Sequence, residues 1–129
     1  MYGFNITVQG DFAAVVTRVT EELKKEGFGV LTDIDVQATL KAKLGEDMRP
    51  YRILGACNPP LAHKAIMMEP DIGLLLPCNV VVREQDDGKI NVGFMDPQAV
   101  LGLVQRKEME SLGADVRARM VRVRDALAK

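Results

Sequence analysis

The sequence has few cysteines and almost no net charge. Among its 129 residues are two cysteines and one histidine, and 17 lysines and arginines nearly balance 18 aspartates and glutamates. Two cysteines cannot form a disulfide framework, so a reducing, cytoplasmic compartment is expected. The missing excess of basic residues argues against a nucleic-acid partner, because binding to phosphates needs positive charge.

Long apolar runs and linkers are also missing. The longest apolar stretch, residues 72–82, is too short to cross a bilayer and is interrupted by Pro77 and Asn79, so no membrane association is expected. No repeat, low-complexity tract or Pro/Gly/Ser-rich linker divides the chain, while 47% of its residues are hydrophobic. These features predict one folded domain, residues 1–129, with its own core.

Apolar periodicity predicts strands and helices in the order β-α-β-α-β-α-β-β-α-α. The expected strands cover residues 2–8, 28–34, 51–56, 78–84 and 89–95, and the expected helices 12–26, 36–44, 59–68, 97–104 and 109–127. Asp86-Asp87-Gly88 is typical of a hairpin turn between the last two strands. A hairpin mixed with helices predicts an α+β fold, in which an antiparallel or mixed sheet carries helices on one face.

The segment from Tyr51 to His63 is the best candidate for a site. It places the Cys57 thiol where a strand ends and a helix begins, with Asn58 as the helix cap. The positive end of a helix lowers the pKa of a nearby thiol and attracts anions. His63 follows about one and a half turns later, and Cys78 begins the hairpin. We therefore predict a ligand-binding set of Cys57, Asn58, His63 and Cys78.

Several interpretations of these residues stay open. In the simplest interpretation, Cys57 and Cys78 are inert hydrophobic residues of a structural dimer module. In a second, they bind a soft metal such as copper or zinc with His63 and Met67 or Met68, although no C-x-x-C pair or second histidine supports this. In a third, Cys57 is the nucleophile of a thiol enzyme of sulfur or redox metabolism, with His63 as base. Ligand binding without the thiols is a further alternative.

Four segments resemble a known family. They are residues 49–65, 72–82, 27–36 and 95–97, and together they resemble the small prokaryotic proteins grouped as domain of unknown function 302. The resemblance implies an α+β fold of the TATA-box-binding-protein-like, β-α-β(4)-α type, and homodimers, but no activity. Its motif positions in this chain are Cys57, Asn58, Pro59, His63, Pro77 and Cys78.

The favoured hypothesis is a homodimeric domain that binds a small ligand or a soft metal near the strand-to-helix turn. Cys57 would be the ligand or reactive thiol, Cys78 its partner across a pocket, and His63 an auxiliary donor or base. Backbone N–H groups after Asn58 would hold an anion. The thiol enzyme is the alternative, so whether the protein catalyses a reaction stays open.

Overall fold

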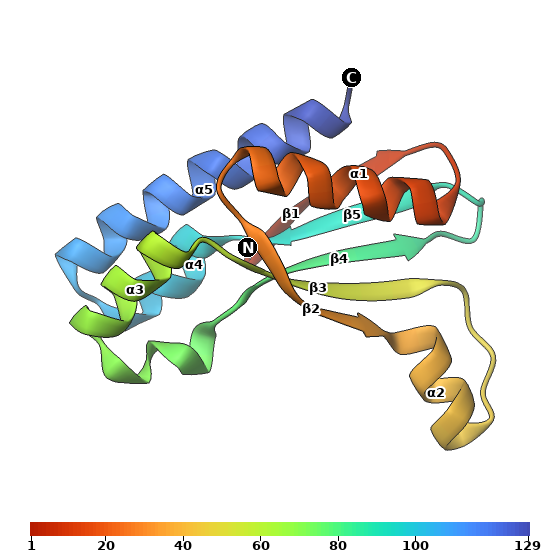
Figure 1. Cartoon of the computed structure of the whole chain (residues 1–129), viewed down its shortest axis with the longest axis horizontal. Coiled ribbons are helices and arrows are strands. Elements are labelled where there is room, and N and C mark those ends of the chain that lie inside the picture. Colours follow the sequence, from red (N-terminus) through yellow and green to blue (C-terminus); the bar gives the residue numbers. More distant parts are fainter.

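The five strands form one antiparallel sheet in the computed structural model, which describes residues 1–129 (Figure 1). The sheet has the order β1-β5-β4-β3-β2. The strands are β1 (Gly3–Val8), β2 (Gly29–Asp35), β3 (Tyr51–Cys57), β4 (Cys78–Glu84) and β5 (Ile90–Met95). All neighbouring pairs are antiparallel, so the α+β class is confirmed and no strand pair makes the sheet mixed.

Two long helices, α1 (Phe12–Lys25) and α5 (Lys107–Leu127), supply the apolar layer over one face of the sheet. They run side by side (Figure 1), and Arg18 of α1 donates a hydrogen bond to the Ala126 carbonyl of α5 (2.8 Å). The predicted helix over 109–127 is confirmed within α5, and its apolar stripe is entirely buried: Met109, Leu112, Val116, Met120, Val123 and Leu127. Burial of this stripe against inward-facing strand residues removes apolar surface from water and holds the layers together.

Local capping signals set the helix starts. The Asp11 carboxylate accepts the Ala14 N–H at α1, and the Asp35 carboxylate accepts the Ala38 N–H at α2 (Val36–Leu44). The remaining α-helices, α3 (Pro59–Met68) and α4 (Pro97–Leu101), each begin with proline at the first position. Proline is favoured there because that N–H has no partner inside the helix.

The chain between α3 and β4 differs from the prediction. No helix or strand is predicted for residues 70–77, but Pro70–Leu75 form a 3-10 helix, η1. The predicted helix over 97–104 is divided into α4 and a second 3-10 helix, η2 (Gly102–Val104). These short helices surround a second apolar core of Ala65, Ile72, Leu101, Met109 and Leu112, beyond the end of the sheet. None of the helices is long and apolar enough to cross a membrane.

The opposite face of the sheet carries a row of side chains that point away from the core. Ile34, Ile53 and Val81 are register partners on β2, β3 and β4, and the row continues through Gly93 to Asn5. Ile34 is 48% exposed. A hollow of about 580 Å³ lies on this face, lined in part by Val81, Asn5 and Gly93. The closer likeness to the TATA-box-binding protein stays a prediction.

Candidate functional site

The two cysteines meet at one end of the sheet because of the strand register. Cys57 is the last residue of β3 and Cys78 the first of β4. Ala56, next to Cys57, is the direct partner of Cys78 in the β3–β4 ladder. Both cysteines are free, and both line the same cavity. The prediction that they share a pocket therefore agrees with this geometry.

The cavity has a volume of about 350 Å³ and lies between the end of the sheet and the helices beyond it. Thirteen of its 17 lining residues are hydrophobic, the two cysteines included. The larger apolar side chains come from five regions of the chain: Phe28, Leu31, Leu61, Ile66, Leu76, Leu101, Leu112 and Val116. Apart from the thiols, the polar side chains on the wall are those of Thr32 and Asn58, and no charged residue lines it.

The two thiols differ in accessibility. Cys78 is 6% exposed, and burial, with a smaller contribution from the nearby Cys57, raises its pKa from 9.0 to about 11. Cys78 therefore stays a neutral thiol across the physiological range, because an apolar environment disfavours the thiolate. Cys57 is half-buried, so it is the thiol that a ligand or reagent in the cavity can reach.

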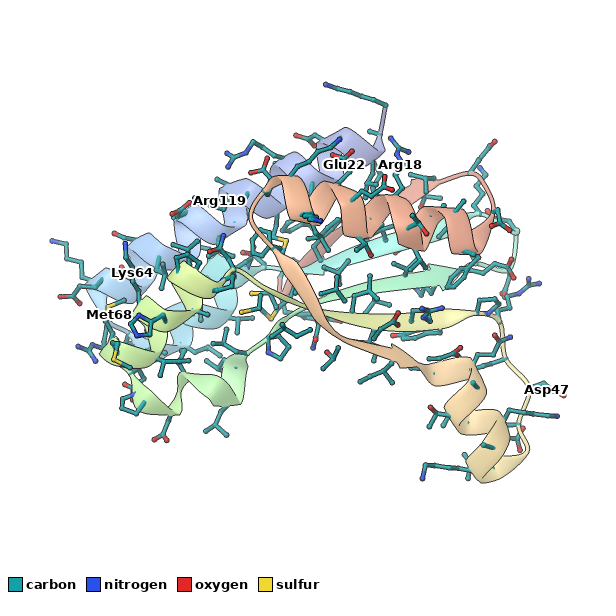
Figure 2. All side chains as sticks on the ribbon, in the orientation of Figure 1. Arg18, Glu22, Asp47, Lys64, Met68 and Arg119 are labelled. Atoms are coloured by element: carbon teal, nitrogen blue, oxygen red, sulfur yellow. The ribbon has the colours of Figure 1, made fainter.

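His63 is not part of this site. Leu61, Ala62, Ala65 and Ile66 line the cavity and share one face of α3, whereas His63 is exposed and absent from the wall. Successive residues of a helix are about 100° apart, so the residue after Ala62 turns toward solvent. Its neighbour Lys64, labelled in Figure 2, is also exposed. The predicted role of His63 as a base or donor beside Cys57 does not fit this arrangement.

Asn58 has the predicted capping role, but the helix start does not suit an anion. The Leu61 N–H donates to Asn58 Oδ1 (3.4 Å), and the Ala62 N–H donates to the Asn58 carbonyl (2.8 Å). The two residues between, Pro59 and Pro60, have no N–H at all. The first turn of α3 therefore offers no free backbone donor, and the basis for an anion site here is lost.

The donor set does not suit the predicted soft-metal site. No group of three or more His, Cys, Asp or Glu side chains is placed to hold a metal ion. Cys57 and Cys78 supply two thiols, but His63 points elsewhere, and Met67 is 66% exposed. Structural zinc sites in proteins use four such donors. The proposed set of Cys57, Cys78 and His63 is thus not assembled.

A close approach of two segments seals one wall. A Cβ on Gly55 of β3 would lie 2.2 Å from Thr32 Oγ1 and 2.8 Å from Pro77 Cγ. No side chain fits there, so glycine lets the bulged strand β2 and the segment before β4 close over β3. Pro77, one of the motif positions of the family resemblance, is thus one of the two close neighbours of Gly55.

Several wall residues could not be found from the sequence. Thr32 belongs to the strand that pairs with β3, and Leu112 and Val116 belong to the buried stripe of α5. Their positions in the sequence do not distinguish them, because a residue that lines a cavity shows the same periodicity along its strand or helix as a core residue. By contrast, the spacing of Leu61, Ala62, Ala65 and Ile66 does indicate which face of α3 turns inward.

Comparisons with known proteins agree with this fold. The family described as domain of unknown function DUF302 matches residues 4–127. A solved structure described as an uncharacterized conserved protein DUF302 from Bacillus stearothermophilus is 30% identical, with a TM-score of 0.89 over 97% of both chains. A comparison with curated proteins finds no match. The family match covers nearly the whole chain, including every residue of the cavity, and the chain therefore belongs to the DUF302 family.

Proposed function

We propose that the cavity beside Cys57 and Cys78 binds a small, predominantly apolar organic molecule. The observation that carries this proposal is the cavity itself, with about 350 Å³ of space and 13 hydrophobic residues among 17. Sites for small molecules in proteins usually have about 300–1,000 Å³ and a mostly apolar wall with few polar groups. A filled cavity also regains the packing contacts that its empty walls lack.

Access to the cavity supports the same function. Leu31 and Ile66 belong to the cavity wall, and they are 67% and 40% exposed. Large apolar side chains next to an opening favour a ligand that covers them, because that removes apolar surface from water. A molecule entering here would pass Cys57 before it reached the deeper Cys78.

The alternatives receive less support from the geometry. A thiol enzyme with Cys57 as nucleophile lacks its proposed base, since His63 is exposed outside the cavity. A soft metal would find two thiol ligands among mostly apolar neighbours, which is fewer than the four donors of a structural zinc site. The reduced thiols suit a reducing compartment, so a cytoplasmic location is part of the proposal.

Titration with toluene tests the proposal. Amide resonances of residues along the wall, followed by ¹H–¹⁵N correlation spectra, should shift and saturate as toluene is added. Ala62→Phe should weaken binding at least about tenfold, because it places a ring inside the cavity. Lys64→Phe is the matched control, since it adds the same ring to an exposed position of α3. Wild-type spectra without saturable shifts, or with shifts remote from the wall, would contradict the proposal.

A further inference from the structure

We infer that the ligand of this cavity is an uncharged molecule whose hydrogen-bond acceptor, such as a ketone, aldehyde or ester oxygen, binds the side-chain amide of Asn58. The inference rests on the proposed function and narrows its ligand class. It starts from an imbalance at Asn58, a side chain that is more than nine-tenths buried (8% exposed) and part of the cavity wall.

The two ends of the Asn58 amide are used differently. Its oxygen Oδ1 accepts the Leu61 N–H and thereby caps α3. Its nitrogen Nδ2, which has two N–H donors, makes no hydrogen bond within the protein. An amide donor in a side chain this buried meets little water, so a hydrogen-bond partner for it is favourable. The capping role fixes the orientation of the amide, because the nitrogen cannot accept the Leu61 N–H.

The position of Nδ2 indicates where its partner would come from. It lies 2.8 Å from where a Cβ of Gly27 would stand, and Gly27 directly precedes Phe28 of the cavity wall. Every fully enclosed side-chain nitrogen or oxygen in this structure has a hydrogen-bond partner. Nδ2 is therefore not fully enclosed, and Asn58 is one of the two polar side chains, apart from the thiols, in the cavity wall. A ligand acceptor there would complete the hydrogen bonding of an otherwise enclosed side chain.

The surroundings of Asn58 favour a neutral acceptor. No charged side chain lines the cavity. Arg119 of α5, labelled in Figure 2, lies beside Gly27, and its guanidinium donates to Asp115 Oδ1 (3.1 Å) and to the Glu26 carbonyl (3.1 Å). The Arg119 guanidinium is thus already paired with the Asp115 carboxylate and the Glu26 carbonyl. An anionic ligand would lose its hydration without gaining an opposite charge, which is unfavourable in an apolar cavity.

Three compounds of nearly the same shape test the inference. Acetophenone has a ketone oxygen, α-methylstyrene has a CH₂ group in its place, and benzoate is charged. Titrations followed by ¹H–¹⁵N correlation spectra give the affinity of each. Acetophenone should bind about fivefold or more tightly than α-methylstyrene, and also more tightly than benzoate. Acetophenone alone should shift the Asn58 side-chain NH₂ resonances.

Two variants of Asn58 separate hydrogen bonding from folding. Both Asn58→Asp and Asn58→Ser keep an oxygen that caps α3, and both remove the amide donor. Asn58→Asp has no donor and places a repelling oxygen near the acceptor, so it should abolish the preference for acetophenone over α-methylstyrene. Asn58→Ser, whose shorter hydroxyl can still donate, should only reduce that preference. Thermal unfolding confirms that each variant is folded.

The outcomes distinguish this inference from the proposed function. Equal affinity of acetophenone and α-methylstyrene for the wild type would overturn the role of Asn58 and leave the apolar site standing. A preference for acetophenone that survives in Asn58→Asp would do the same. Tighter binding of benzoate would overturn the neutral ligand class. Failure of all three compounds to bind would count against the proposed function itself.

Discussion

The Asn58 amide nitrogen lies 2.8 Å from the position that a Cβ of Gly27 would occupy. Gly27 also has a φ of +87°, which side chains of L-residues adopt only with strain. We expect Gly27→Ala to lower the free energy of unfolding by about 2–3 kcal/mol, from backbone strain and from displacement of the α3 cap. Urea denaturation monitored by circular dichroism measures this change.

Gly29 supplies the control for that prediction. It stands two residues later in the chain, has no atom within 4 Å of its Cβ position, and does not have a positive φ. Gly29→Ala should change the stability by less than about 0.5 kcal/mol. Equal effects of the two substitutions would show that Asn58 and Gly27 are not coupled.

Local signals made most of the fold predictable. The Asp11, Asp35 and Asn58 caps are short-range features, because each side chain accepts an N–H three residues ahead. The β4–β5 hairpin follows from alternation on either side of an Asp-Gly turn. Such signals depend on neighbours in the sequence, and the structure confirms the elements that they indicate. The 3-10 helix η1 lacks a side-chain cap, and its start was not predicted.

The candidate site depended on contacts that local patterns do not encode. Cys57 and Cys78 are 21 positions apart in the chain, and only the β3–β4 register brings them to one cavity. Two other features of the site, in contrast, could have been deduced from the sequence. The helical spacing of Leu61 and Ala65 indicates that His63 points outward. Proline chemistry shows that Pro59 and Pro60 supply no N–H donors.

The two thiols should react at very different rates. At pH 8, iodoacetamide should alkylate Cys57 in the folded protein and leave Cys78 unmodified. With a pKa of about 11, Cys78 has roughly one thiolate in a thousand at that pH, and its sulfur is also buried. Mass analysis of proteolytic peptides identifies the modified residue. In urea both cysteines should react. Modification of Cys78 before Cys57 in the folded protein would contradict the prediction that Cys57 is the accessible thiol.

Cys78 should make the protein less stable at alkaline pH. Its pKa is raised on folding, so the folded state holds the thiol proton more tightly than the unfolded state. This contribution is complete below pH 9 and is lost as the pH rises toward 11, with a total of about 2–3 kcal/mol. Urea titrations at several pH values give the free energy of unfolding as a function of pH for the wild type and Cys78→Ala. This free energy should fall more steeply between pH 9 and 11 for the wild type. The same pH dependence in both proteins would exclude a role for Cys78.

Self-association should use the uncovered face of the sheet. The family resemblance predicts a homodimer, and the Ile34, Ile53 and Val81 row is the apolar feature of the face opposite α1 and α5. A twofold axis would place this row against itself. We expect light scattering to give the mass of a dimer for the wild type. Val81→Glu should weaken the dimer at least about tenfold, because it buries an unpaired charge at the contact.

Leu103 provides the matched control for the dimer prediction. It is 71% exposed on η2 and does not line the hollow on the sheet face. Leu103→Glu introduces the same charge, and it should leave both the dimer and the thermal stability unchanged. Because Val81 points away from the core, Val81→Glu should also stay folded as a monomer. A wild-type monomer at all concentrations would refute the homodimer, while equal dissociation by both variants would place its interface elsewhere.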